Sequence, residues 1–151
     1  MKQDPQLQRV EARMKPGVLT RDGFLGSDRR GLAEILLADE AEVNRLGIDH
    51  RQIADRLRRL LEQGLPGLGT EVEVDGTFLV SVDDARGRLP SPWPGEGTFP
   101  KTNIYARRID TGEEIAYTVL QLHLIEVHGF YQGRESPFRL EPAALREFLR
   151  L

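Results

Sequence analysis

Residues 119–140 read VLQLHLIEVHGFYQGRESPFRL, and the fold of the whole chain is best deduced from this stretch outward. At about 100° per residue on a helix, the leucine, isoleucine and valine side chains of its first half cover most of the circumference. A helix that is apolar on nearly every side is buried, so we expect a central buried helix near 119–128. Gly129 follows at the position where such a helix ends.

Two further helices are expected earlier in the chain, as an N-terminal αα-hairpin at residues 28–63. The first has one apolar face and Ser27 in place to cap its N-terminus. The second begins after Asp49, because Gln52 three residues later completes a capping box. Gly64 stands where this second helix should end.

Two antiparallel β-hairpins are expected between these helices and the central one. The segment EVEVDGTFLVSV (71–82) alternates apolar and polar residues on both sides of Asp-Gly, a strong signal for a hairpin turn. Residues 103–109 and 114–118 predict the second hairpin. Between the hairpins, residues 86–101 hold four prolines and three glycines, which predicts a long, stiff loop. A short C-terminal helix is expected to begin at Pro142.

This order of elements predicts an α+β fold, because helices and strands are segregated along the chain rather than alternating. Residues 1–14 are polar and lack apolar periodicity, so we expect a flexible tail and leave both Met1 and Met14 open as the natural start. Residues 15–151 are expected to form a single α+β domain, since a chain of 151 residues can bury one core without disulfides.

Composition disfavours or excludes several classes of protein. The formal net charge is −3 and there are no cysteines. A negative chain has no overall field to attract nucleic acid or anionic membranes, and without thiols it has no disulfide, no cysteine nucleophile and no cysteine-ligated metal. The sequence also has no apolar run long enough to cross a bilayer. We therefore expect a soluble, cytoplasmic protein that binds neither membranes nor nucleic acid.

The two histidines of the central stretch raise the question of a metal site. In the metalloprotease motif HExxH the histidines are four apart and share one helix face, whereas His123 and His128 are five apart, about 140° around the helix. We therefore expect that these two do not serve one ion. His123 and Glu126 do share a face and could supply two ligands of a metal-dependent enzyme. Candidates for a third ligand are Asp83, Asp84 and His50. A divalent metal is the only cofactor that this pattern leaves open, and a hydrogen-bonded structural pair is the alternative.

The segment after the helix suggests a different function. Arg134 and Arg139 lie near Tyr131 and His128, and planar guanidinium groups match carboxylate or phosphate groups with two hydrogen bonds. Trp93, in the proline-rich stretch, could border the same site. Salt bridges to nearby glutamates are the structural alternative. We expect the protein to be a binding module for a small anionic ligand or a protein partner; catalytic residues remain unassigned, and whether it is an enzyme stays open.

Residues 28–63 offer a third function, because a helix, a short turn and a second helix resemble a DNA-binding helix-turn-helix. The arginines of the second helix are Arg51, Arg56, Arg58 and Arg59. Acidic residues interrupt this positive charge and the first helix is acidic, which disfavours binding to phosphate backbones.

The string LQLHLIEVHGFYQG, with SPFRLEP after it and SPWPGEGTFPK before it, resembles a group of short bacterial cytosolic proteins that have no assigned activity. The resemblance covers most of the chain after Met14. It implies an independent small domain and supplies no substrate, cofactor or catalytic residue.

Overall fold

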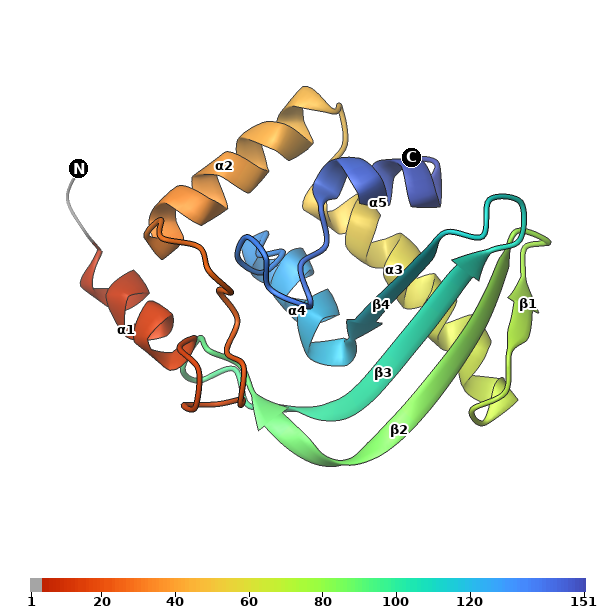
Figure 1. Cartoon of the computed structure of the whole chain (residues 1–151), viewed down its shortest axis with the longest axis horizontal. Coiled ribbons are helices and arrows are strands. Elements are labelled where there is room, and N and C mark those ends of the chain that lie inside the picture. The colour runs from red at the N-terminus through yellow and green to blue at the C-terminus, as the bar shows by residue number, and fades with distance from the viewer. Residues whose placement is uncertain (1–3) are drawn as a thin grey trace.

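A computed structural model describes residues 4–151 and has the α+β architecture expected from the sequence. The helices are α1 (Pro5–Arg13), α2 (Leu32–Arg45), α3 (His50–Gly64), the short 3-10 helix η1 (Leu65–Gly67), α4 (Val119–His128) and α5 (Pro142–Leu149), and the strands are β1 (Val72–Val74), β2 (Phe78–Pro90), β3 (Thr98–Arg108) and β4 (Glu114–Thr118). The sheet curves strongly around α4, and α3, α4 and α5 lie on its inner side (Figure 1).

The four strands form one antiparallel sheet in the order β1-β2-β3-β4. Val80 pairs with Ala106 and Ile104 pairs with Tyr117, and all four side chains are buried against the helices. Because side chains alternate between the two faces of a strand, the residues between them face outward. The predicted hairpin patterns are therefore confirmed, with one apolar face toward the core.

The loop predicted at residues 86–101 is shorter than expected, because β2 continues to Pro90 and β3 begins at Thr98. The register shifts between Asp84 and Arg88, after which Arg88 pairs with Pro100. Beyond the ends of β1 and β4 this part of the hairpin is a ribbon of only two strands. Each strand then has a free outer edge, where a proline that lacks an N–H group breaks no ladder hydrogen bond.

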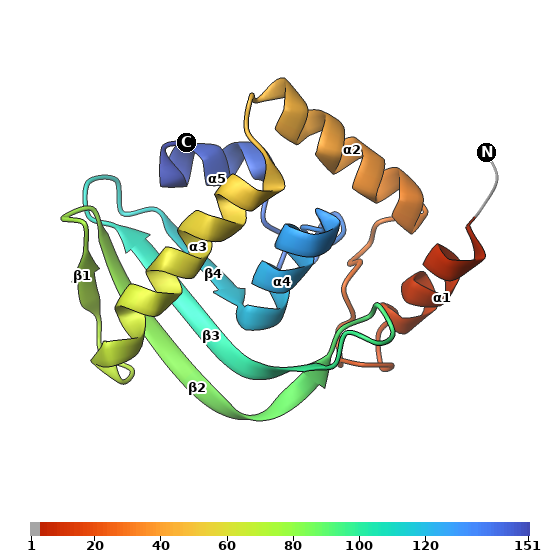
Figure 2. The same ribbon diagram turned by 180° about the vertical axis from the view of Figure 1, so that it is seen from behind.

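The predicted helix pair is present, but its helices diverge from their connecting turn instead of packing along each other (Figure 2). The capping box at Asp49 and Gln52 is confirmed. The first helix begins later than predicted, with Gly31 rather than Ser27 at its N-cap. The hydroxyl of Ser27 instead donates a hydrogen bond to Glu135, so this residue connects the N-terminal segment to the region after α4.

The expectation of a flexible tail at residues 1–14 is wrong for the residues that the structure describes. Pro5–Arg13 forms helix α1, capped by the side chain of Asp4. Val10 and Met14 are completely buried. Their burial against the second apolar cluster explains why so polar a segment is ordered: two well-placed apolar side chains anchor it.

Helix α4 is central, as predicted from its apolar circumference. Leu122 and Ile125 belong to the main core between the sheet, α3 and α5. Leu120 and Leu124 belong to a second apolar cluster, together with Val10 and other side chains from α1, α2 and the proline-rich region. The helix therefore joins the two halves of the protein interior, and its polar side chains are held on a rigid support.

Candidate metal centre

The two histidines of α4 are fixed by the ends of that helix. Thr118, the last residue of β4, caps the helix in a reciprocal box with Gln121, so no loop separates strand from helix. Gly129 ends the helix in the left-handed conformation, with φ of 64°. His123 lies in the middle of the helix and His128 is its last residue.

A third group, Glu96, reaches these histidines from the turn between β2 and β3. This turn is closed by a hydrogen bond from the backbone N–H of Ser91 to the carbonyl of Gly97. Arg13 at the end of α1 donates to the backbone carbonyls of Ser91 and Pro92, at 2.8 Å each. Helix α1 thus holds the turn against α4.

The carboxylate of Glu96 lies between the two imidazole rings. Its Oε1 is 3.0 Å from Nε2 of His123 and its Oε2 is 2.8 Å from Nε2 of His128. The hydroxyl of Ser91 donates to Oε1 at 2.6 Å. The three potential ligand atoms lie within 4.8 Å of one another. Ligands around a tetrahedral zinc ion are about 3.3 Å apart, so the most widely spaced pair has to move closer when an ion binds.

The spacing of His123 and His128 predicted that they would not serve one ion, yet both contact the carboxylate of Glu96. An angle of about 140° around a helix leaves a surface between the two side chains, and a group lying over that surface can be reached by both. Glu96 occupies this place. The expected partner of His123, Glu126, is elsewhere: its Oε2 accepts from Arg58 at 2.7 Å, and it is not part of the metal-ligand cluster formed by the described residues.

The three residues considered as further ligands are also outside the cluster formed by residues 4–151. The carboxylate of Asp84 accepts from the hydroxyl of Thr102, and Asp83 pairs with Asn103 in the sheet. His50 hydrogen-bonds to Tyr131 through Nδ1. The ligand that sequence reasoning missed, Glu96, lies 27 positions from His123. Its only sequence signal was its place in the proline-rich stretch, in which Trp93 was expected to border a binding site.

Aromatic rings enclose the cluster on two sides. Trp93 is stacked on His128, with ring centroids 3.7 Å apart and planes 6° from parallel. Phe99 lies against His123 at 4.4 Å. The side chains of His123 and Glu96 are each 21% exposed and that of His128 is 17% exposed. The three side chains are therefore packed against rings and remain partly accessible to solvent.

The protonation of the cluster is set by burial and by the hydrogen bonds within it. Burial raises the pKa of Glu96, but hydrogen bonds from Ser91, His123 and His128 outweigh it, so the pKa is below its ordinary value. Burial lowers the pKa of His128, more than Glu96 raises it. Because an ionised carboxylate only accepts hydrogen bonds, each histidine donates its Nε2 proton to Glu96. That proton has to leave or move to Nδ1 before Nε2 can bind a metal ion, so metal binding replaces these two hydrogen bonds and depends on pH.

The five residues proposed for anion binding are not brought together at one site. Trp93 stacks on His128, whereas the side chain of Arg134 is exposed and its backbone N–H donates to Asp28. Arg139 forms a bidentate pair with Asp39, at 2.7 and 2.8 Å, and also contacts Glu141. The hydroxyl of Tyr131 is bound to His50 at 2.7 Å. Of these candidates, the described structure places Trp93 and His128 at the metal cluster instead. The N–H groups of Arg139 are all occupied by protein partners, so this arginine is not available to bind an anion.

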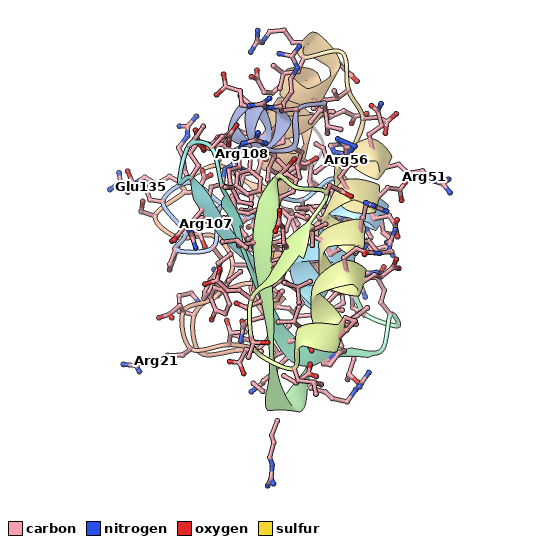
Figure 3. All side chains as sticks on the ribbon, turned by 90° about the vertical axis from the view of Figure 1, so that its right-hand side faces the viewer. Arg21, Arg51, Arg56, Arg107, Arg108 and Glu135 are labelled. Atoms are coloured by element: carbon pink, nitrogen blue, oxygen red, sulfur yellow. The ribbon has the colours of Figure 1, made fainter. Side chains whose placement is uncertain are left out.

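Three of the four arginines of α3 are engaged in the same way. Arg58 pairs with Asp55 and Glu126, Arg59 pairs with Asp75, and Arg56 donates to a backbone carbonyl of α5. Arg51 extends away from the protein surface (Figure 3). Helix α3 also packs on the sheet and on α4, so it does not present a free, positively charged face to DNA.

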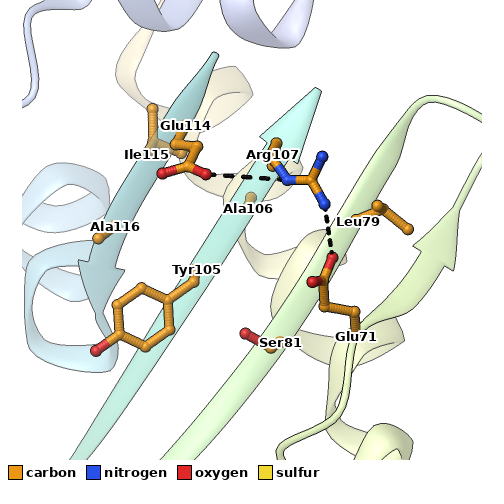
Figure 4. A pocket seen from close by; sticks show the side chains of 9 residues that line it. All are labelled: Glu71, Leu79, Ser81, Tyr105, Ala106, Arg107, Glu114, Ile115 and Ala116. Carbon is orange, nitrogen blue, oxygen red and sulfur yellow. Dashed lines mark hydrogen bonds and ion pairs between the residues drawn. The ribbon is translucent and has the colours of Figure 1, made fainter. Parts of the chain in front are cut away.

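A hollow of about 450 Å³ lies on the outer face of the sheet (Figure 4). Its one arginine, Arg107, lies between Glu71 at 3.2 Å and Glu114 at 3.9 Å. Tyr105 beside them is 48% exposed. With its cation neutralised on both sides, this hollow lacks the converging polar groups that the cluster at Glu96 has.

No family model, curated protein or solved structure matches this chain. The site must therefore be interpreted from its own chemistry. Among the residues that the structure describes, no helix is both long and apolar enough to span a membrane.

Proposed function

We propose that the protein binds a divalent transition-metal ion through Glu96, His123 and His128. The observation that carries this proposal is that one carboxylate and two imidazole nitrogens, from two separate elements, lie within 4.8 Å of one another. Two imidazoles and a carboxylate favour zinc, iron, manganese or nickel over magnesium or calcium, which prefer oxygen ligands alone.

Three features of the surroundings support this proposal. Ser91 orients the carboxylate, as groups around known metal ligands do. Trp93 and Phe99 fix the planes of the two imidazoles by packing. Three protein ligands that remain partly accessible to solvent correspond to a centre that also binds water or substrate, whereas purely structural zinc sites use four protein ligands. A metal-dependent enzyme is therefore favoured over the anion-binding module expected from sequence, although with Glu96 in place of Glu126.

Metal titration of the purified protein tests the proposal. We expect zinc, manganese or nickel to bind with one ion per chain by calorimetry and to raise the melting temperature. Removal of an orienting group costs about 10–100-fold in affinity at known sites, so Glu96→Gln and His123→Ala should each lose at least about 100-fold.

Glu126→Gln is the matched control, because Glu126 lies between the two histidines in sequence but pairs with Arg58. Its affinity should equal that of the wild type. The proposal is wrong if the wild-type protein shows no saturable binding of these ions, or if Glu126→Gln weakens binding as much as Glu96→Gln.

The cytoplasm remains the proposed location of the protein. The absence of cysteine is consistent with a protein that does not depend on oxidative folding, and detection of the tagged protein in fractionated cells would test this.

A further inference from the structure

A cavity separate from the metal cluster lies where helix α3, the turn between β1 and β2 and the C-terminal end of α5 meet. Its volume is about 220 Å³, and none of the three metal-site residues lines it. Four arginines do line it: Arg56 and Arg59 of α3, Arg108 at the end of β3 and Arg150 directly after α5. In a chain of formal net charge −3, so many cations around one hollow require an explanation.

The positive charge of this cavity exceeds the negative charge that is paired with it. One of its arginines pairs with Asp75 at 2.7 Å. Arg108 and Arg150 share the single carboxylate of Asp110, at 2.9 and 2.6 Å. Arg56 forms no ion pair with any residue of the described range 4–151. Four guanidinium groups are therefore balanced by two carboxylates, which leaves an excess of two positive charges.

Capping of α5 accounts for only part of this charge. Arg56 donates to the carbonyl of Leu149 at 2.9 Å and Arg108 donates to that of Phe148 at 2.6 Å, so both stabilise the end of this helix (Figure 3). A helix C-terminus carries about half of one negative charge, which is less than the excess. Arg56 also uses only Nη2 for its bond, and its Nε and Nη1 donate to no group within residues 4–151. In this it differs from Arg139, whose N–H groups are all occupied.

The four arginines differ in how far solvent reaches them. Arg56 is exposed, and the side chains of Arg59 and Arg150 are 52% and 66% exposed. Arg108 is only 3% exposed, and its Cζ lies 5.4 Å from the centre of the Phe78 ring. An ion in the cavity would therefore contact the three accessible guanidinium groups and would also be attracted by the fixed, covered charge of Arg108.

We propose that this cavity binds a phosphate group, either as inorganic phosphate or as part of a small phosphorylated molecule. A phosphate group carries about 1.5–2 negative charges at pH 7, which matches the excess of two positive charges. Planar guanidinium groups bind its oxygens with paired hydrogen bonds. Liquid water occupies about 30 Å³ per molecule, so the cavity has room for a phosphate group and a small substituent.

Other anions suit the same space less well. A carboxylate has one negative charge and would leave half of the excess unbalanced. A nucleic acid would place further phosphates beside the first, where the partly exposed carboxylates of Asp75 and Asp110 would repel them. A single phosphate group uses the excess charge without meeting these carboxylates.

Inorganic phosphate, methyl phosphate and acetate test the proposal when each is added to the full-length protein at pH 8 and constant ionic strength. EDTA is present throughout, so no phosphate can bind through a metal ion at Glu96 and the result is independent of the metal proposal. Heteronuclear NMR titration with inorganic phosphate should show saturable shifts confined to residues around the cavity, such as Thr77 and Phe78. Acetate should bind at least about tenfold more weakly, because it forms fewer charge-assisted hydrogen bonds. If methyl phosphate binds as tightly as inorganic phosphate, the site takes a phosphorylated small molecule, and if it binds more weakly, the site takes the free ion.

Arg56→Gln and Arg150→Gln each remove one positive charge from the cavity. Loss of one charge-assisted hydrogen bond corresponds to about tenfold or more in affinity, so each variant should bind inorganic phosphate at least about tenfold more weakly. Arg150→Gln leaves the bond from Arg56 to α5 intact, so the test does not depend on that bond. Arg51→Gln is the matched control, because Arg51 lies on the same helix as Arg56 and extends away from the protein surface (Figure 3). The proposal is overturned if inorganic phosphate gives no saturable shifts at this cavity, if acetate binds as tightly, or if Arg51→Gln weakens binding as much as Arg56→Gln and Arg150→Gln.

Discussion

The indole ring of Trp93 lies flat against the imidazole ring of His128, with ring centroids 3.7 Å apart. This is the only tryptophan of the chain, so the emission of the protein reports directly on the candidate metal centre. Bound nickel, which has a partly filled d shell, should quench this emission, whereas zinc with its filled shell should not. Fluorescence titration checks this, and excess zinc should restore the signal by displacing nickel. Equal quenching in His128→Ala would contradict the assignment.

Arg13 should affect metal affinity without being a ligand. Its guanidinium holds the carbonyls of Ser91 and Pro92 at 2.8 Å, and so fixes the turn that carries Glu96. We expect Arg13→Gln to weaken metal binding by about tenfold, the lower end of what is seen for groups that orient ligands. Calorimetry on Arg13→Gln and on Arg9→Gln, a change at an exposed position of the same helix, measures the difference. Equal affinities in both variants would show that α1 does not position the turn.

A side chain at position 129 should destabilise the protein, and more so while His50 is present. Gly129 has φ of 64°, and a Cβ atom there would overlap the imidazole of His50. We expect Gly129→Ala to lower the free energy of unfolding by about 1–2 kcal/mol for the left-handed backbone, and further for the overlap. Gly47→Ala is the control, because Gly47 has φ of 72° with open space around it. Adding His50→Ala should remove part of the extra cost in urea denaturation, and a strictly additive double variant would refute the overlap.

His50 should make the protein less stable in acid. Burial lowers its pKa below the ordinary value of 6.5, against the attraction of Glu40, Asp39 and Asp49. His50 therefore takes up a proton more readily in the unfolded chain than in the folded protein. The contribution of neutral, buried His50 to the free energy of unfolding is complete above pH 6.5, and it is lost as the pH falls toward the lower pKa of the folded state. Denaturation of the wild type and His50→Gln between pH 8 and pH 5 checks this. As the pH falls, the free energy of unfolding should decrease more for the wild type than for His50→Gln. If the two free energies change with pH by the same amount, His50 has no such effect.

The two carboxylates that pair with Arg139, those of Asp39 and Glu141, should contribute very differently to stability. The side chain of Asp39 is 6% exposed, whereas that of Glu141 is 59% exposed. Breaking a buried ion pair typically costs about 3–5 kcal/mol because the remaining charge is left unpaired, whereas an exposed pair contributes about 0–1 kcal/mol. We therefore expect Asp39→Asn to be much more destabilising than Glu141→Gln in chemical denaturation. Similar losses in both would mean that solvent reaches the Asp39 pair.

The fold could be predicted because its signals are local. The capping box at Asp49, the turn at Asp75-Gly76 and the break at Gly129 each depend on residues within a few positions. The extension of β2 and β3 could not be predicted, because whether a proline fits a strand depends on where the neighbouring strands end. Helix α1 was missed because its burial depends on few apolar side chains, the fully buried Val10 and Met14 and the partly buried Leu7.

The candidate site could be predicted only in part. The histidines of α4 were identified by residue type, but their third partner is set by the path of a hairpin far away in the sequence. Helical angles separate His123 from His128 by about 140°, and they contain no information about a group placed over the surface between them. Sequence spacing also suggested Glu126 as a partner, although Arg58 from another helix binds it.

The irregularity in β2 has a consequence for how the protein can change by insertion or deletion. Between the pairs Asp84 with Thr102 and Arg88 with Pro100, β2 advances by four residues and β3 by two, so β2 contains two extra residues. An even number keeps the paired residues of β2 and β3 on the same face of the ribbon as each other, whereas loss of one residue would turn the rest of β2 over relative to β3. We expect lineages that keep Glu96 beside the histidines to gain or lose residues here only in twos, so related chains should be sought by this parity rather than by a contiguous motif.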